Sequence, residues 1–309
     1  MFSQAMKMSR SRWIQLLIFL ALLSAIFLSL PQSTSPHPWN NLTGDLVVDN
    51  LDDSDPSPAV QKHASNTPPN PLDRTLGFGR IYVINIASRT DRRQVMTAIA
   101  KYLNLDFSFI SATLTNDPVV RTLHNRTGLK RVVLACYRSH MSVYEDVVAK
   151  NLTSALVLED DIDVEADLTS RVAALLPYLP VSWEMLYLGN CNPGNPQESD
   201  GEPLPGNPIL RKSKLPYCTH SYAVSAKGAV KLLGLLAEPT IAVDVQIARN
   251  IRDGKIEAFS VVPVMTTQSR DSPSDISKNW KEMHADLLED SVLARLKKEG
   301  LLEKGKTEE

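Results

Sequence analysis

Short apolar runs alternate with segments of helical periodicity from residue 80 onward. The runs at 80–86, 107–112, 154–158, 184–188 and 219–224 predict strands, and the first of them is rich in β-branched residues. Helical spacing predicts helices at 91–103, 134–150, 166–176, 226–236 and 245–251, with Thr90 and Ser225 as caps of the first and fourth. The stretch from Gly189 to Pro216 is rich in glycine and proline and is expected to be a loop. Strands alternating with helices indicate an α/β sheet with parallel members.

The N-terminal region predicts a membrane anchor. Residues 13–30 carry no charge and follow the basic residues Lys7, Arg10 and Arg12, which fits a single transmembrane helix. Basic flanks stay cytosolic, so residues 1–12 are expected in the cytosol and the rest of the chain in the lumen. The alternative is a cleaved signal peptide, but its apolar region is usually shorter and ends at a small-x-small site, which residues 28–30 lack. We therefore expect a single-pass type II protein of the Golgi or endoplasmic reticulum membrane.

Residues 31–76 predict a lumenal stem. Eight of the chain's 20 prolines lie there among serine, asparagine and aspartate, so the segment cannot bury enough apolar surface to offset its ordering entropy. The predicted folded domain covers residues 77–285, and residues 286–309 form a charged, helix-prone tail without an assigned function.

Charge and cysteine content narrow the function. The chain has 33 basic and 35 acidic side chains, a balance that argues against a nucleic-acid partner, because such a protein needs a basic surface for phosphates. Three cysteines without a CxxC pair argue against a disulfide scaffold or structural zinc. An enzyme or a folded binding module remains.

Three carboxylates follow the strand at 154–158 directly. Ligands of α/β sheets bind beyond the carboxyl ends of the strands, which is where Glu159, Asp160 and Asp161 are expected. If the alternation of the strand continues, Glu159 and Asp161 face one side and could link Mg²⁺ or Mn²⁺ to a diphosphate. The alternative is an acidic turn that merely closes the strand.

Six segments together resemble a known family. They are IYVINIASRTDRR (81–93), ACYRSHMSVYEDVV (135–148), ALVLEDDIDVE (155–165), MLYLGNC (185–191), THSYAVSAKGAVKLL (219–233) and IAVD (241–244). In this order they are similar to the family 25 glycosyltransferases, which include lipopolysaccharide-type and collagen-type galactosyltransferases. The resemblance covers roughly residues 79–275.

The resemblance implies a fold and a donor. The fold would be of the GT-A nucleotide-sugar-binding type, with a mixed, mainly parallel sheet flanked by helices. The donor would be a UDP-sugar, commonly UDP-galactose, used with Mn²⁺ or Mg²⁺ and with inversion at the anomeric carbon. Glu159, Asp160 and Asp161 would then bind the metal, which stabilises the charge of the leaving diphosphate.

Further residues gain expected roles from the resemblance. Asn85, Arg89 and Arg92 are placed as nucleotide contacts, although solvated charges at a helix start would explain Arg92 nearly as well. His140 is expected either in the donor site or as a buried structural histidine, and His220 is expected to face donor or acceptor.

Asp244 is the candidate general base. An inverting transfer needs a group that takes the proton of the acceptor hydroxyl, and Asp244 is the family-matched carboxylate outside the acidic cluster. The alternative is an acidic residue favoured at a helix N-terminus by the dipole.

Cysteines and glycosylation sequons fit a lumenal domain. Cys191 and Cys218 flank the Gly/Pro-rich loop and are expected to form a disulfide, whereas Cys136 is expected to be a buried free thiol. Asn41, Asn125 and Asn151 lie in Asn-x-Ser/Thr sequons, which also arise by chance.

The expected function is transfer of a sugar, galactose above all, from a UDP-sugar to a hydroxyl of a glycan, glycolipid or protein in the secretory pathway. One alternative is an inactive relative that keeps the fold to bind carbohydrate or a protein partner. A second is a glycoside hydrolase, which also uses two carboxylates but needs neither UDP nor Mn²⁺.

Overall fold

The computed structural model of the chain describes residues 73–191, 200–269 and 288–302. All of them belong to one compact unit, Ser65–Glu309. No helix in these ranges is long and apolar enough to cross a membrane. The predicted membrane span at 13–30, most of the predicted stem and the sequon at Asn41 lie outside the described residues.

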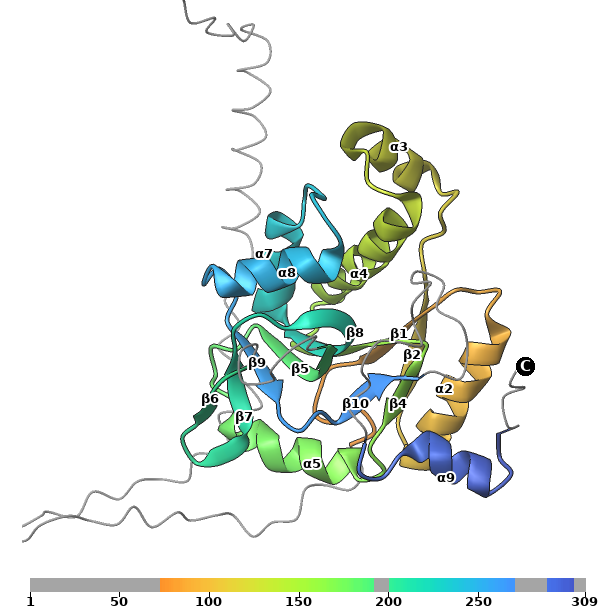
Figure 1. Cartoon of the computed structure of the whole chain (residues 1–309), viewed down its shortest axis with the longest axis vertical. Helices are drawn as coiled ribbons and strands as arrows, with labels where there is room; N and C mark the ends of the chain where they lie inside the picture. Colours follow the sequence, from red (N-terminus) through yellow and green to blue (C-terminus); the bar gives the residue numbers. More distant parts are fainter. Residues whose placement is uncertain (1–72, 192–199, 270–287, 303–309) are drawn as a thin grey trace, which may run out of the picture. The chain divides into compact units, whose positions relative to one another are not determined.

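A mixed sheet forms the centre of the described structure (Figure 1). Its eight strands have the order β2-β1-β3-β8-β5-β9-β7-β6. The pairs β1–β2, β1–β3 and β5–β9 are parallel, and the other four pairs are antiparallel. The strands are β1 (Ile81–Asn85), β2 (Phe107–Ser111), β3 (Ser154–Glu159), β5 (Met185–Cys191), β6 (Asp200–Leu204), β7 (Asn207–Ser213), β8 (Tyr217–Ser225) and β9 (Ala258–Val261). A small antiparallel sheet pairs β4 (Ile162–Val164) with β10 (Thr266–Gln268).

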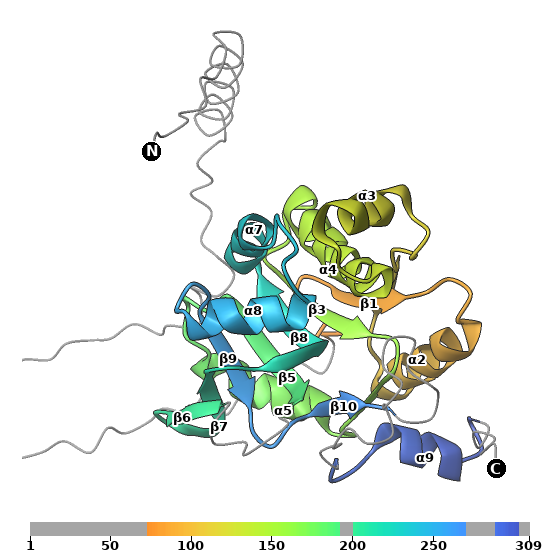
Figure 2. The ribbon, with the colours of Figure 1, turned by 45° about the horizontal axis from the view of Figure 1, so that its top comes forward.

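Helices cover both faces of the sheet (Figures 1 and 2). On one side lie α4 (Arg131–Ala149), α7 (Ala226–Leu235) and α8 (Val243–Arg252). On the other lie α2 (Thr90–Leu103), α5 (Leu168–Leu175) and α9 (Val292–Lys298). The short helix α3 (Pro118–Thr127) packs on α4, and a 3-10 turn, η2 (Leu176–Tyr178), continues α5.

Alternation along the central strands builds two cores. In β1, Ile81 and Val83 face the core of α2, α5 and α9, whereas Tyr82 and Ile84 face that of α4, α7 and α8. The same alternation in β3 places Leu156 on the first side and residues 155 and 157 on the second. Burial on both faces explains why these strands appear in the sequence as continuous apolar runs.

The predicted Gly/Pro-rich loop is wrong in its central part. There β6 and β7 form an antiparallel hairpin at the edge of the sheet. Proline lacks a backbone donor and is tolerated in edge strands, and Pro203 lies in β6, the outermost strand.

The two predicted helix caps differ in outcome. Ser225 caps α7 as expected, because its hydroxyl accepts a hydrogen bond from the Gly228 N–H at 3.0 Å. Gly228 also allows close packing, since an added Cβ would lie 2.2 Å from the carbonyl oxygen of Glu184. The prediction for Thr90 is wrong, because α2 begins at Thr90 itself and no side chain caps it.

The described part of the predicted tail packs on the domain. Val292, Leu293 and Leu296 of α9 are buried in the core beside α2 and α5. The segment before α9 is held by the residue that follows β4, because the carboxylate of Glu165 accepts hydrogen bonds from the N–H groups of Glu289 and Asp290 at 2.8 and 2.9 Å.

Candidate functional site

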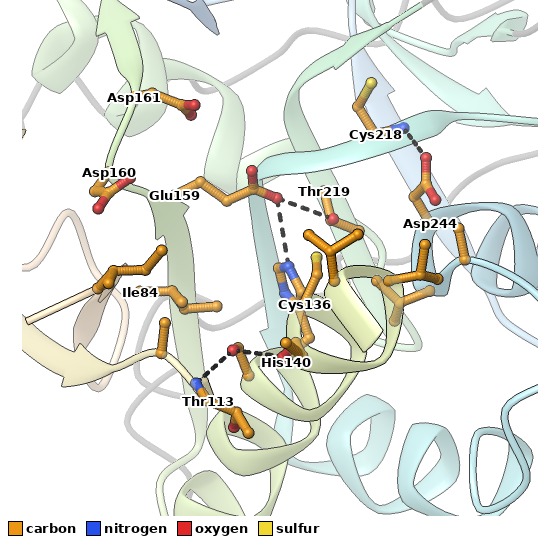
Figure 3. Close-up of a pocket in the computed structure, with 18 of the residues that line it drawn as sticks. Ile84, Thr113, Cys136, His140, Glu159, Asp160, Asp161, Cys218, Thr219 and Asp244 are labelled. Carbon is orange, nitrogen blue, oxygen red and sulfur yellow. Dashed lines mark hydrogen bonds and ion pairs between the residues drawn. The ribbon is translucent and has the colours of Figure 1, made fainter. Parts of the chain in front are cut away.

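A cavity of about 380 Å³ lies beyond the carboxyl ends of β1, β2 and β3 (Figure 3). This is where the strand-end rule for α/β sheets places a ligand. Its walls come from the end of β1, from residues 112–115 after β2, from the first half of α4, from the β3–β4 turn, from the start of β8 and from the N-terminus of α8. Residues that are far apart in the sequence thus share one cavity.

The acidic segment lies in a turn. β3 ends at Glu159, residues 160–161 form a turn, and β4 begins at Ile162, so strand alternation does not continue to Asp161. One nitrogen of Arg92, in the first turn of α2, lies 2.8 Å from a carboxylate oxygen of Asp160 and 3.0 Å from one of Asp161. These three side chains are 8%, 8% and 14% exposed. Arg92 therefore partly neutralises the turn.

Asn85 supports the turn from β1. Its side-chain amide donates to Asp160 Oδ2 at 2.7 Å, while Arg92 donates to Asp160 Oδ1 at 2.8 Å. Asn85 is buried and does not line the cavity. Asp160 is thus bound on both carboxylate oxygens, and Asn85 lies behind this carboxylate.

Glu159 has different partners. Its Oε1 accepts a hydrogen bond from the Thr219 hydroxyl at 3.1 Å and lies 3.4 Å from His140 Nε2. Burial raises the pKa of Glu159, but the hydrogen bond and charge of His140, with smaller contributions from His220 and Thr219, outweigh it, so the pKa lies below its usual value. Glu159 is therefore held as a carboxylate on the α4 side of the cavity.

His140 is both a buried structural histidine and a residue of the cavity wall, the two alternatives that the sequence left open. The residue is buried, and its Nδ1 lies 3.0 Å from the hydroxyl of Tyr222, which in turn lies 2.6 Å from the hydroxyl of Tyr144. Its Nε2 faces Glu159 at the cavity wall. His140 is thus structurally anchored in the core and also lines the site.

Asp244 lines the cavity from a separate element, the first turn of α8. Its Oδ2 accepts a hydrogen bond from the Cys218 N–H at 3.3 Å. Cys218 has φ of 64°, in the left-handed region that non-glycine residues rarely adopt. The residue with this unusual backbone conformation is therefore the one whose N–H holds Asp244, the candidate base.

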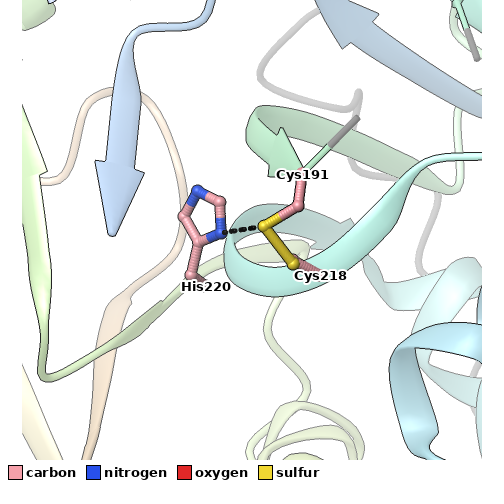
Figure 4. A group of neighbouring side chains, drawn as sticks. All are labelled: Cys191, Cys218 and His220. Carbon is pink, nitrogen blue, oxygen red and sulfur yellow. Dashed lines mark hydrogen bonds between the residues drawn. A yellow bond between two sulfur atoms is a disulfide. The ribbon is translucent and has the colours of Figure 1, made fainter. Parts of the chain in front are cut away.

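The expected disulfide joins Cys191 and Cys218 (Figure 4), with their Cα atoms 5.4 Å apart. The prediction is confirmed. His220 Nδ1 lies 4.0 Å from the sulfur of Cys191. His220 is buried and packs against Gly189, where an added Cβ would lie 2.5 Å from its Nε2. The residue does not line the cavity.

Arg89 also lies away from the cavity lining. Its guanidinium pairs with the exposed carboxylate of Asp91 at 2.9 Å. The sequons at Asn125 and Asn151 lie in the described residues, and both asparagines are exposed. Asn151 has φ of 51°, a conformation that asparagine tolerates better than most residues.

Cys136 is a site residue that was not predicted. It is a free thiol as expected, but it is only partly buried and lines the cavity. Burial, together with the charges of Glu159, Asp244 and Asp161, raises the pKa of this thiol well above its usual value. The available signal was its spacing of four residues from His140, which places both side chains on one face of a helix.

The charges of the cavity fit a divalent cation. Its lining includes four carboxylates, but Arg92 is the one guanidinium or ammonium group among the lining residues. A diphosphate would be repelled by such a wall unless a cation came with it. Carboxylate oxygens are the ligands that Mg²⁺ and Mn²⁺ prefer. Among the described residues, however, Glu159, Asp160 and Asp161 do not form a group of three with ligand atoms all within 4.8 Å.

Comparison with known proteins identifies relatives. The family model described as "Glycosyltransferase family 25 (LPS biosynthesis protein)" matches residues 78–247. A human protein named "Inactive glycosyltransferase 25 family member 3" is 30% identical over 205 residues, which cover 61% of this chain and 33% of that protein. "Procollagen galactosyltransferase 1-B" of Xenopus laevis is 29% identical over 199 residues, covering 59% of this chain and 32% of that one. The chain thus matches about a third of the length of these relatives.

A solved structure described as a "glycosyltransferase involved in the glycosylation of the major capsid of PBCV-1" covers 60% of this chain and 92% of its own. Its identity of 9% and TM-score of 0.30 are too low to carry an argument. The family model, in contrast, spans more than half of the chain and includes every residue of the cavity except Gln268. The chain belongs to glycosyltransferase family 25.

Proposed function

We propose that the chain is a metal-dependent, inverting glycosyltransferase that takes a sugar from a UDP-sugar. One observation carries the proposal: a carboxylate from α8 and an acidic turn from β3 line the same strand-end cavity. In Figure 3, Asp244 and Asp161 lie on different sides of Glu159. A base for the acceptor and a site for the diphosphate can therefore come from separate elements.

Asp244 would act as the general base. The acceptor oxygen forms a bond to the anomeric carbon while the bond from that carbon to the diphosphate breaks. The electron pair leaves with UDP, and the hydroxyl proton passes to Asp244. The hydrogen bond from the Cys218 N–H to Asp244 Oδ2 fixes this carboxylate.

Asp161, with Asp160 beside it, would hold the Mn²⁺ or Mg²⁺ ion. The ion would stabilise the negative charge that develops on the leaving diphosphate. Asp160 is the less available ligand, because Asn85 and Arg92 already occupy its two oxygens. Arg92 lines the cavity and can donate to a phosphate oxygen, as arginine commonly does.

Galactose is the proposed sugar, and a protein or glycan hydroxyl is the proposed acceptor. The support is the name of the Xenopus laevis relative, a procollagen galactosyltransferase, which is 29% identical to this chain over 199 residues. We extend the proposal to a GT-A type of fold and to action in the lumen of the secretory pathway. The disulfide Cys191–Cys218 and the exposed sequons at Asn125 and Asn151 support the lumenal location.

A second candidate is an inactive relative that binds a partner or a carbohydrate. Arg92 favours it, because a guanidinium already pairs with both carboxylates of the turn. The human relative is also named inactive. The presence of Glu159, Asp160, Asp161 and Asp244 around one cavity favours activity instead.

Donor hydrolysis separates the two candidates. The full chain is incubated with a panel of UDP-sugars, with Mn²⁺ or with a chelator, and release of UDP is followed. The enzyme is expected to hydrolyse one UDP-sugar slowly, in a manner that requires Mn²⁺ and is lost in Asp161→Asn. If UDP binds but no sugar donor is turned over, with or without glycan and peptide acceptors, the inactive candidate is correct.

A further inference from the structure

Three side chains with different metal-binding atoms meet on the α4 side of the cavity. Cys136 and His140 lie one turn apart on α4, and Glu159 ends β3. A sulfur, an imidazole nitrogen and a carboxylate oxygen from these residues all lie within 4.8 Å of one another. All three residues line the cavity, so an ion can reach them from solvent.

The group needs little rearrangement to bind an ion. Tetrahedral zinc has bonds of about 2.0–2.3 Å, which place neighbouring ligand atoms roughly 3.5 Å apart. His140 Nε2 and Glu159 Oε1 are already 3.4 Å apart. The sulfur of Cys136 lies within 4.8 Å of both atoms.

Neighbouring groups hold the ligands in position. His140 Nδ1 lies 3.0 Å from the Tyr222 hydroxyl, which leaves Nε2 directed at the cavity. Glu159 is held by the Thr219 hydroxyl at 3.1 Å. Metal-binding histidines usually have such a partner on their second nitrogen.

The ligand types select the metal. Thiolate and imidazole favour Zn²⁺, whereas the all-oxygen Asp160–Asp161 turn favours Mg²⁺ or Mn²⁺. Three protein ligands would leave a fourth position open toward the cavity. We propose that Cys136, His140 and Glu159 form a second metal site, specific for Zn²⁺ or a similar thiophilic cation, beside the acidic turn.

The other group of this kind in the described residues does not qualify. Cys191, Cys218 and His220 also bring their ligand atoms within 4.8 Å of one another. The two sulfurs are bonded to each other, so they offer no thiolate. Since the sequence has three cysteines, Cys136 is left as the one thiol of the oxidised chain.

Occupation of this site has a consequence for catalysis. A zinc ion there would lie inside the cavity and would bind Glu159 and His140, so Zn²⁺ should inhibit turnover supported by Mn²⁺. This consequence rests on the proposed function. Metal binding itself does not, so a direct binding measurement separates failure of the site from failure of the proposed activity.

Cobalt(II) is the probe, because it replaces zinc and absorbs in the near ultraviolet when a thiolate binds it. The full chain, oxidised and free of any polyhistidine tag, is titrated with Co²⁺ and then with Zn²⁺. We expect a thiolate-to-cobalt band that Zn²⁺ abolishes. Because a single thiol is present, the band assigns the ligand.

Variants test the thiol ligand and the hydroxyl that holds His140. Cys136→Ser and Cys136→Ala should lose the band and weaken Zn²⁺ binding by at least about 100-fold, and Tyr222→Phe should keep the band with roughly 10–100-fold weaker binding. Asp161→Asn is the matched control and should keep the band, because Asp161 is not one of the three ligands. The proposal is overturned if a folded chain with a titratable Cys136 thiol shows no band, or if the band persists in both Cys136 variants.

Discussion

Arg92→Gln tests the electrostatic account of the acidic turn. The substitution removes the positive charge that lies 2.8 Å from Asp160 and 3.0 Å from Asp161, and glutamine keeps some of the length and polarity of the side chain. The two carboxylates would then repel each other at a site with little solvent. We expect the variant to be much less stable without a metal and to regain stability when Mn²⁺ is added.

The size of the effect follows from burial. The side chains involved are largely buried, with exposed fractions of 8% for Arg92, 8% for Asp160 and 14% for Asp161. Removing the Arg92 guanidinium therefore breaks a buried ion pair. Such a change usually costs about 3–5 kcal/mol of unfolding free energy. A ligand that binds the native state alone, at about 100 times its Kd, returns about 2.7 kcal/mol. Mn²⁺ should therefore restore most of a loss at the lower end of this range and about half of one at the upper end.

The assay is urea unfolding of the full chain with Mn²⁺ or with a chelator. Arg89→Gln is the control, because Arg89 and its partner Asp91 are 20% and 60% exposed and such pairs contribute only about 0–1 kcal/mol. Stabilisation by Mn²⁺ should be larger in Arg92→Gln than in the wild type, where the guanidinium competes for the same oxygens. An equal metal response in both proteins would refute the assignment of Asp160 and Asp161 as the metal site.

Three further predictions concern the rest of the chain. Replacing both Cys191 and Cys218 by serine should lower the free energy of unfolding by roughly 3 kcal/mol, as measured in urea, because the disulfide closes a loop of 26 residues (218 − 191 − 1). Burial raises the pKa of Glu184, but Lys231, the Glu257 N–H and Lys227 together lower it by more than burial raises it. The pKa therefore lies below its ordinary 4.5. Glu184→Gln should thus cost about 1–3 kcal/mol at pH 7, and this difference should shrink as the pH falls from the ordinary value through the folded-state pKa, because the unfolded wild-type chain then binds a proton before the folded chain does. Protease added to sealed microsomes should spare residues 77–285, and digestion of this region would exclude the lumenal location.

The sequence predicted the central strands well for a physical reason. Both faces of β1 and β3 are buried, so nearly every position must be apolar and the runs are conspicuous. The hairpin of β6 and β7 was missed, because its edge position tolerates proline and exposed polar residues that otherwise indicate a loop. α3 was missed although Asp117 caps it and Pro118 occupies its first turn, a pair of start signals that the sequence did contain.

The site was predictable in its residue types but only partly in its geometry. Placing Glu159, Asp160 and Asp161 at the end of a strand follows from the sheet rule, and all three line the cavity. The pairing of Arg92 with Asp160 and Asp161 depends on how α2 packs beside the β3–β4 turn, which local pattern does not encode. For the same reason, the contact of His140 with Glu159 and the placement of Asn85 behind Asp160 required the folded chain.

Titration calorimetry with UDP and Mn²⁺, paired with turnover of the donor, tests the central claim most directly when applied to Asp244→Asn and Asp161→Asn. The account predicts that Asp244→Asn binds UDP almost normally while turnover falls by about 10² to 10⁴, the usual contribution of a positioned base. Asp161→Asn should instead weaken both UDP binding and its dependence on Mn²⁺. Loss of UDP binding in Asp244→Asn with normal binding in Asp161→Asn would contradict both assignments and would place the metal at Asp244.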